Sequence, residues 1–427
     1  MSVLSSRTQR ILEAPVLPLL LSLAAPNIGE AAARITFLTA DALFVSWLGS
    51  DALAGVAVVF PLFLILQTAT ASGFGSGVSS AIGRALGAGD HGQAASLAGV
   101  AVSIALVGGA LEMAMLYGAV MFSGSVLVWL MNLLANVSRG AGNMMVPAFA
   151  IAIGEAFHLA LSPALILGWG PFPALGIVGA ALAAVVAYGV GAIVLVVHLM
   201  SRQALIRLRL GAIRLKRKEA AAILGVGVVS AASATLFQVS TFFVAGVLAI
   251  LGSSTVAAYG AAVRLELLQY PITFAFGSAV ITMVATAAGA RDFARAQRAA
   301  WTGAAVAAAI GLVFTVVALF GRQWMGLFTS DPEIRDMGAL YLLSQAAVFP
   351  LTGAGLASYF ACLGIGFVGW PFALAALRLL LIVSGAWLAL MLTGDAGAPF
   401  AIVAVGIASF AVGLLIAMRA RFRRLAG

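Results

Sequence analysis

Long runs of apolar residues, separated by short polar breaks, follow one another along almost the whole chain. They fill residues 15–200 and again 220–418, and many reach the length of about 20 residues that a helix needs to cross a bilayer. The runs are continuous rather than alternating, which favours helices over a membrane barrel. The pattern therefore predicts an all-α membrane protein with about twelve transmembrane helices.

Three motifs occur twice along the chain, in the same order. The first copies are "LGSDALAG" at 48–55, "GFGSGVSSAIGRALGAGD" at 73–90 and "RGAGNMMVP" at 139–147. The second copies are "LGSSTVAA" at 251–258, "AFGSAVITMVATAAGARD" at 275–292 and "LGIGFVGWP" at 363–371, and the offsets in numbering are 203, 202 and 224. Such an internal repeat is typical of transporters, which bind their substrate between or within the two halves near mid-depth.

The repeat divides the chain into two pseudo-symmetric six-helix bundles, at 1–200 and 220–427, joined by a basic cytoplasmic linker at 201–219. Because each half has room for six spans, the two copies run in the same direction across the membrane. The offset rises from 202 to 224, so the first half is 22 residues shorter between its third and fourth spans. We expect a very tight outer connection there and a deformed pair of spans.

The composition agrees with this interpretation, since 9% of the residues are charged against roughly 25% in a soluble domain. A net charge of +9 could also indicate a nucleic-acid partner, so the positions of the charges matter. With the N-terminus inside, 18 of the 23 Lys and Arg residues fall in cytoplasmic segments, Arg84 and Arg139 among them. This imbalance follows the positive-inside rule, places both termini in the cytoplasm and makes a nucleic-acid partner unnecessary.

The sequence shows no sign of an enzyme, a cofactor or a metal site. It has no His/Cys cluster with metal spacing, no Ser/His/Asp set and no phosphate loop between a strand and a helix. "GFGSG" at 73–77 lacks that context and is interpreted as helix packing. Cys362, the single cysteine, is interpreted as a small packing residue. The first apolar run continues past residue 40 without a cleavage site, which predicts a retained span.

Five stretches, taken in order, match a known pattern: "LGSDALAG", "GRALGAGD" at 83–90, "RGAGN" before Pro147, "FPALGIVGAALA" at 172–183 and "LFTSDPEIRDMGALYLL" at 327–343. Over residues 15–415 the chain resembles the multidrug and toxic compound extrusion (MATE) family of twelve-span antiporters. The resemblance implies alternating access between two bundles and export of small molecules.

An acid in the first span resembles the DinF-like branch of that family, which implies that Asp41 is the protonation site of proton-coupled export. That branch has an Asn and an Asp four residues apart before a Pro in the fifth span, where this chain has His158 and Ser162 before Pro163. The sodium-coupled branch has acids in the seventh and tenth spans. Residues 220–250 and 341–363 contain no acid, which argues against sodium coupling.

Ionisable groups inside spans are costly in lipid and are functional candidates by default. The five acids in spans are Glu30, Asp41, Glu112, Glu155 and Glu266. On a helix the neighbours of Asp41 one turn away are apolar, so none of them can pair with a charge. Burial disfavours the ionised form, and such a carboxyl group can take up and release a proton. The alternative is a structural carboxylate held by hydroxyls or amides of another helix.

Aromatic residues surround Asp41 in the sequence. Phe37, Phe44 and Trp47 are candidates for the apolar wall of an outward-opening cavity that Asp41 faces. Pro26 precedes Asp41 on the same helix and removes a backbone hydrogen bond there. We expect a hinge or a static kink at that position.

Two further pairs are candidates for a relay or for polar groups of the cavity. Glu30 precedes Arg34 by four residues, so the two can neutralise each other on the helix, or line one path with Asp41. Glu155 and His158 are three residues apart on one helix face and either relay protons or form a structural hydrogen bond. For Glu266, two residues after Arg264 and on a different side of the helix, we expect partners across the bundle.

Together these observations predict a secondary active antiporter in the cytoplasmic (inner) membrane of a prokaryote. It would export hydrophobic or cationic small molecules, such as drugs or toxic metabolites, in exchange for protons, as a monomer in the lipid bilayer. One alternative is a lipid-precursor flippase, for which Arg34, Arg264 and Arg378 are the basic candidates. A sodium-coupled exporter and a membrane-embedded transferase with an acid/His site are the others.

Overall fold

The computed structural model describes residues 6–46, 66–113, 124–208 and 216–426. Only the backbone is described for residues 34–46, 108–113 and 177. The side chain of Glu112 is therefore not described. The tight connection predicted between the third and fourth spans, at 114–123, also lies outside the described residues.

In the described part of the first half, a short helix is followed by six longer segments, one of which combines a π-helix with an α-helix. They are α1 (Ser6–Glu13), α2 (Val16–Ser46), η1 (Ala69–Phe74) with α4 (Gly75–Gly87), α5 (His91–Met113), α7 (Ser125–Gly140), α8 (Met145–Leu167) and α9 (Ile177–Met200).

The second half also contains six long segments, one of which is bent. They are α10 (Arg217–Leu248) with η3 (Ala249–Leu251), α11 (Ser253–Gly289), α12 (Phe293–Leu319), α14 (Pro332–Ala346) with α15 (Phe349–Gly364), α16 (Gly369–Thr393) and α17 (Gly397–Ala426). A short α13 (Gly321–Met325) precedes α14. The predicted linker falls between α9 and the first turn of α10, while the domain boundaries themselves stay a prediction.

The helices have the length and apolar character of membrane spans. Within the described ranges, eight are long and apolar enough to cross a bilayer, and α14 with α15, bent by 54°, makes a ninth. The remaining segments, η1–α4, α5 and α7, complete two sets of six. The expected all-α architecture of two six-helix bundles is confirmed. The core of the second half is α11, whose most apolar 18-residue stretch is 78% buried.

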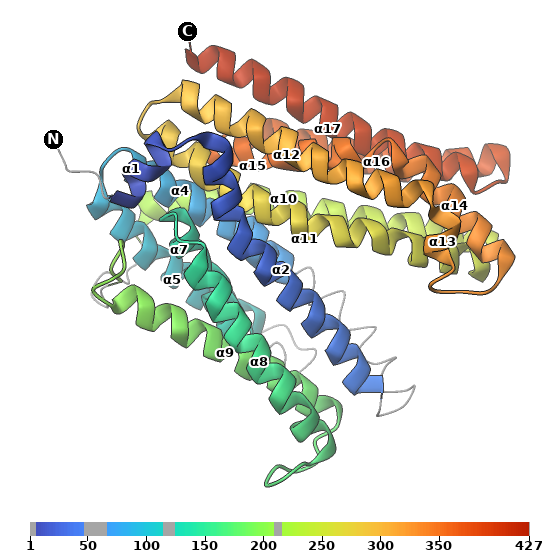
Figure 1. The fold of residues 1–427 in the computed structure, drawn as a ribbon, viewed down its shortest axis with the longest axis horizontal. Helices are drawn as coiled ribbons and strands as arrows, with labels where there is room; N and C mark the ends of the chain where they lie inside the picture. Colours follow the sequence, from blue (N-terminus) through green and yellow to red (C-terminus); the bar gives the residue numbers. More distant parts are fainter. Residues whose placement is uncertain (1–5, 47–65, 114–123, 209–215, 427) are drawn as a thin grey trace.

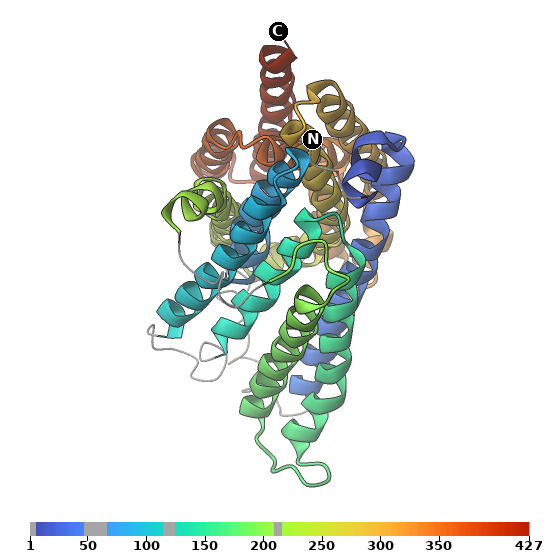
Figure 2. The ribbon, with the colours of Figure 1, turned by 90° about the vertical axis from the view of Figure 1, so that its left-hand side faces the viewer.

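The two bundles meet at one end of the molecule. Figure 1 shows α7, α8 and α9 running in one direction and α10, α11, α16 and α17 in another, with the chain termini near the end where the two groups converge. Figure 2 shows the same division after a quarter turn. At this end the last turns of α4 and α11 pack against each other. We call it the basic end, because Arg84 contacts Gly289, the Arg139 carbonyl accepts from Thr282 and Arg295 donates to the Ile11 carbonyl there.

The packing of α4 on α11 brings the two copies of the longest repeat into direct contact. A Cβ on Gly87 would lie 1.9 Å from the Thr286 carbonyl oxygen, and a Cβ on Gly289 would lie 2.1 Å from the Arg84 carbonyl oxygen. Gly289 is the counterpart of Gly87 in the repeat, and Thr286 is the counterpart of Arg84, so the two contacts are equivalent. Such reciprocal contacts are the mark of a twofold interface.

Substituting Ala for Gly87 or Gly289 is expected to separate α4 from α11, because the obstructing atoms belong to the backbone and cannot turn aside. Overpacking of this kind costs about 1–3 kcal/mol, which a thermal melt of the purified protein should register as a lower melting temperature. Gly260→Ala is the matched control, since it lies on the same helix with no atom within 4 Å of a built Cβ. An equal response of Gly260→Ala and Gly289→Ala would contradict the packing argument.

The glycines of "GFGSG" serve helix packing, as expected from the sequence. A Cβ on Gly73 would lie 2.5 Å from the Cα of Ala231, and one on Gly77 would lie 2.4 Å from the Ile223 carbonyl oxygen. Both contacts join the first half to α10. The halves therefore remain in contact from the basic end up to the level of Gly73 and Ala231, and Asn27 adds a bond of 3.3 Å from its Nδ2 to the Ala275 oxygen.

Candidate functional site

The backbone of α2 is helical through Ser46, so Asp41 lies on this helix as expected, with Pro26 inside the same helix. Helix α2 packs against α8 within its own half and against α11 of the other half. The side chains of Arg34, Phe37, Asp41 and Phe44 lie outside the description, as does the whole of Trp47. Their predicted roles therefore stay predictions, supported only by the position of the α2 backbone.

Glu30, the other acid of α2, forms an ion pair with Arg139 of α7. The two side chains are only 12% and 7% exposed, respectively, so the pair is largely removed from water. Arg139, for which a cytoplasmic segment was predicted, lies in the last turn of α7 and is buried there. No signal in the sequence indicates this pair, because 109 positions separate its members and the nearby Arg34 offers a simpler partner.

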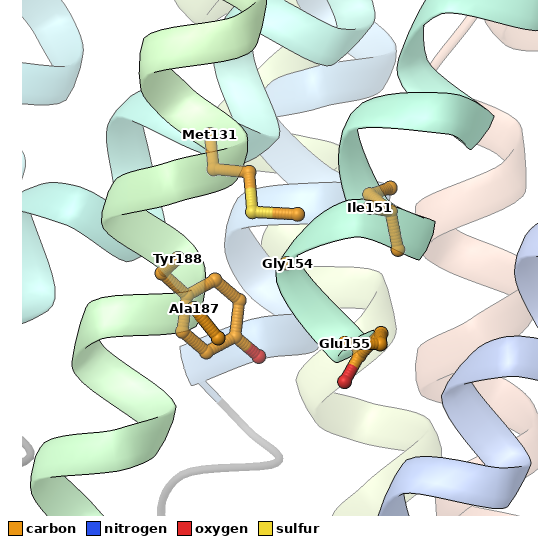
Figure 3. Close-up of a pocket in the computed structure, with 6 residues that line it drawn as sticks. All are labelled: Met131, Ile151, Gly154, Glu155, Ala187 and Tyr188. Atoms are coloured by element: carbon orange, nitrogen blue, oxygen red, sulfur yellow. The ribbon is translucent and has the colours of Figure 1, made fainter. Parts of the chain in front are cut away.

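Glu155 of α8 lies beside a small cavity between α7, α8 and α9. Its other lining residues are Met131, Ile151, Gly154, Ala187 and Tyr188. Figure 3 shows the Glu155 carboxyl group and the Tyr188 hydroxyl at the same end of this space. The cavity has a volume of about 10 Å³, which is enough for the centre of one water molecule. Glu155 thus occupies a position suited to proton exchange with a water molecule.

His158 follows Glu155 by almost one turn and is completely buried. Its ring lies against the backbone of Ala180 on α9. The structure therefore places the two predicted relay residues on neighbouring parts of the same helix, with Glu155 at the cavity and His158 at the contact between α8 and α9.

A chain of buried polar groups leads away from the cavity, and sequence reasoning missed it. Gln67 Nε2 donates to the Tyr188 hydroxyl at 2.7 Å, and Asn132 Nδ2 donates to Gln67 Oε1 at 2.7 Å and to Thr70 Oγ1 at 2.9 Å. These bonds join four elements: α9, the segment before η1, η1 itself and α7. We call these residues, with Asn136 and Ser79, the polar chain.

The polar chain continues along α7 towards the basic end. Asn136 Nδ2 donates to the Asn132 carbonyl at 2.9 Å, and Ser79 Oγ donates to Asn136 Oδ1 at 2.9 Å. Gly75 makes room for this amide, because a Cβ there would lie 2.2 Å from Asn136 Nδ2. Buried networks of this kind fix helix positions when every member is satisfied.

The π-helix η1 lies between the polar chain and the second half. Asn136 Nδ2 donates to the Ala71 carbonyl at 3.3 Å, and Ser230 Oγ of α10 donates to the Ser72 carbonyl at 3.3 Å. A π-helix leaves backbone groups available for such bonds and is often found at functional sites. The polar chain is thus connected, through one irregular turn, to the contact between the halves.

The second half contains a separate polar cluster around Glu266 of α11. The Tyr341 hydroxyl of α14 donates to Glu266 Oε1, and the Tyr341 ring contacts Tyr259 at 5.2 Å between centroids. Arg264 lies over the Phe328 ring, 5.1 Å from its centroid. The expected partner across the bundle is confirmed for Glu266, and Arg264 likewise has a partner outside its own helix.

The Glu266 cluster borders another water-sized cavity, of about 10 Å³, at the bend between α14 and α15. Gln269 Nε2 donates to the Phe349 carbonyl at 2.9 Å, and Gln345 Nε2 donates to the Phe400 carbonyl at 3.2 Å. Gln345 Oε1 is buried without a hydrogen-bond partner among the described residues. The arrangement can hold a water molecule between Glu266 and Gln345.

Arg378 of α16 is buried in the second half. Its guanidinium group lies 4.8 Å from the centroid of the Phe237 ring and donates to Ser240 Oγ at 3.2 Å. As for metal ions, the described side chains contain no group of three His, Cys, Asp or Glu residues close enough to hold one.

Comparison with known proteins identifies relatives over most of the chain. It is 28% identical over 366 residues to the FAD transporter of Shewanella oneidensis, covering 78% of this chain and 79% of that protein. It is 27% identical over 345 residues to the probable multidrug resistance protein YoeA of Bacillus subtilis, covering 74% and 73%.

A solved structure has the same fold. It is described as a MOP superfamily transporter from Pyrococcus furiosus, and it superposes on the whole of both chains with a TM-score of 0.89 at 23% identity. The family model MatE matches residues 26–117 and 228–388, which is more than half of the chain and includes parts of both halves. The chain therefore belongs to the MatE family of membrane transporters.

Proposed function

We propose that this transporter exports hydrophobic or cationic small molecules in exchange for protons, and that Asp41 is the group that is protonated. The observation that carries the proposal is the pairing of the other acid of α2: Glu30 is already neutralised by Arg139. Asp41 follows about three helical turns later on the same helix. Its neighbours in the sequence are apolar, so a proton is the natural means of neutralising it.

Glu155 and the polar chain support a proton pathway within the first half. Helix α8, which carries Glu155, packs against α2, which carries Asp41. Glu155 shares its cavity with Tyr188, and Tyr188 is the first member of the polar chain. Protonation of Asp41 would thus be communicated by way of Glu155 and hydrogen-bonded groups to η1, where the halves touch. We assign His158 a supporting role in positioning α8 against α9.

The transport cycle we propose is alternating access, in which the basic end is cytoplasmic and closed in this structure. Substrate would bind among apolar and aromatic side chains, Phe37, Phe44 and Trp47 included, and would leave when Asp41 takes up a proton from outside. Pro26 would be the hinge of α2. The protein would act as a monomer of the DinF-like branch in a prokaryotic inner membrane, with bundles at 1–200 and 220–427.

Organic anions are a second substrate class, favoured by one observation in the second half. Arg378 is 6% exposed and stacks on Phe237, a combination suited to a planar, negatively charged ligand. One relative is an FAD transporter, and another is a probable multidrug resistance protein. We place organic cations and apolar drugs first, because the proposed coupling group is an acid.

Transport by purified protein in liposomes tests the proposal. An imposed pH gradient is expected to drive movement of the cationic dye ethidium, with protons moving in the opposite direction, and a sodium gradient alone is not. FAD in place of ethidium tests the anionic class, and a fluorescent lipid tests the flippase alternative. Ethidium movement that follows sodium and ignores the pH gradient would contradict proton coupling.

A further inference from the structure

Two hydroxyl groups at the basic end cross from one half of the protein to the other. Ser80 Oγ on α4 donates to the Leu363 carbonyl of α15 at 2.6 Å. Thr282 Oγ1 on α11 shares its one proton between the Arg139 carbonyl of α7, at 3.0 Å, and the Ser278 carbonyl of its own helix, at 3.1 Å. Both hydroxyl-bearing residues are fully buried, so neither bond is exchanged for water in this structure. We call the two bonds the hydroxyl pair.

The two bonds are equivalent under the internal repeat. Thr282 is the counterpart of Ser80 at the offset of the "GFGSG" repeat, and Leu363 is the counterpart of Arg139 at the offset of the "RGAGN" repeat. Each half therefore supplies one donor and one acceptor. The donor is a serine in one half and a threonine in the other, but both hydroxyls bond to equivalent carbonyl groups. The two halves therefore share the hydrogen bond and not the identity of the residue.

The acceptor carbonyls belong to the last turns of their helices. Helix α7 ends at Gly140 and α15 ends at Gly364, each one residue after its acceptor. Carbonyls in a final turn lack the usual partner of the helix interior. Each already accepts one backbone bond, from Gly142 N at 2.8 Å or from Gly366 N at 3.0 Å. The hydroxyl from the other half uses the remaining lone pair.

The surrounding contacts position these bonds. Gly140 packs on Ser79, with 3.0 Å between its built Cβ and the Ser79 Cα, and Gly364 packs on Ile281, with 3.1 Å to the Ile281 carbonyl. These two contacts are again related by the repeat, and Arg84 adds a bond of 3.1 Å to the Gly364 carbonyl. The hydroxyl pair thus lies where the close-packed surfaces of both halves meet.

We propose that the hydroxyl pair is a symmetric latch that sets the balance between closure and opening of the basic end. The donor and acceptor of each bond are neutral, and each bond is worth little once water can replace it; the Ser80 hydroxyl in addition accepts from the Arg84 guanidinium group. When the halves separate, water can solvate both hydroxyls and both carbonyls. The latch therefore favours closure without making opening prohibitive. It is independent of where substrate or protons bind, although its use in a cycle rests on the alternating access proposed above.

The distance between the halves at the basic end tests the latch. Nitroxide labels on Ala88→Cys and Arg298→Cys, both exposed, in a Cys362→Ala background report that distance by double electron–electron resonance in lipid nanodiscs. Ser80→Ala and Thr282→Val each remove one hydroxyl; Ser80→Ala also removes an acceptor of Arg84, so Thr282→Val is the more specific of the two. The ratio of separated to closed molecules is expected to rise about fivefold for each change and about 25-fold for both.

Matched controls distinguish loss of the latch from a general loss of protein stability. Thr282→Ser keeps the hydroxyl and should keep the parent distance distribution. Ser358→Ala with Thr235→Val removes two hydroxyls that bond within their own helices, and should also leave the distribution unchanged. If the double latch variant does not fold, Thr282→Val against Thr282→Ser decides alone.

Unchanged distances in Thr282→Val, or equal changes in the control pair, would overturn the latch. The measurement requires neither substrate nor a pH gradient, so failure of proton coupling in the liposome assay would not alter its outcome.

Discussion

Replacing Asp41 with Asn is expected to abolish ethidium movement driven by a pH gradient, reducing it to the rate of empty liposomes. The amide keeps the size of the carboxyl group and can still form hydrogen bonds, but it cannot take up or release a proton. If Asp41 carries the coupling proton, this variant has no group at that position to take its place. Flux measured in liposomes, with equal amounts of folded protein, gives the result directly.

Two comparisons establish that the loss arises from proton chemistry. Asp41→Glu restores a titratable carboxyl group one methylene farther along and should recover part of the flux. Glu155→Gln, at the cavity shared with Tyr188, should slow transport without abolishing it, because we assign Glu155 to the pathway rather than to the coupling step. Undiminished flux in Asp41→Asn would refute the coupling role outright.

The second large effect is expected from Arg139→Met. Glu30 and Arg139 are 12% and 7% exposed, so removing the guanidinium group takes the counter-charge from a carboxylate that water reaches poorly. Breaking a buried pair in this way costs about 3–5 kcal/mol. We expect a marked fall in the melting temperature and in the yield of folded protein, measured by thermal unfolding in detergent.

An exposed pair supplies the control for this prediction. Arg322 Nε lies 2.7 Å from Asp336 Oδ1, and the two side chains are 67% and 56% exposed. Arg322→Met should therefore change stability by less than about 1 kcal/mol. The double variant Glu30→Leu/Arg139→Met removes both charges and should recover most of the loss. A melting temperature for Arg139→Met equal to that of the parent would mean that Glu30 is adequately stabilised by other groups.

The fold could be predicted from the sequence because the bilayer limits the choices. Continuous apolar runs require helices, the internal repeat divides the chain into two halves, and the length of each half leaves room for six spans. The contact of Gly87 with α11 could not be predicted in the same way. Small residues indicate that a close approach occurs, but they do not identify the partner helix.

The candidate site was predicted less completely, because polar partners are set by the arrangement of helices. The pairing of Glu30 with Arg139 joins α2 to α7, and no spacing rule reaches that far. The polar chain had a local signal that sequence reasoning did not use: Asn132 and Asn136 are four residues apart in an apolar run, so they lie on one face of α7. A search for polar pairs at helical spacing would have found it.

The reciprocal contact of Gly87 and Gly289 has the geometry of a homodimer interface, although both sides belong to a single polypeptide. Once two identical subunits become one chain, a substitution in one copy no longer appears in the other. The offset of the "LGSDALAG" repeat makes Val244 the counterpart of Asp41, and Val244 is only 3% exposed and packs in an apolar core. The two halves of one chain can therefore differ at equivalent positions: the first has an acid at Asp41, where the second has the apolar side chain of Val244.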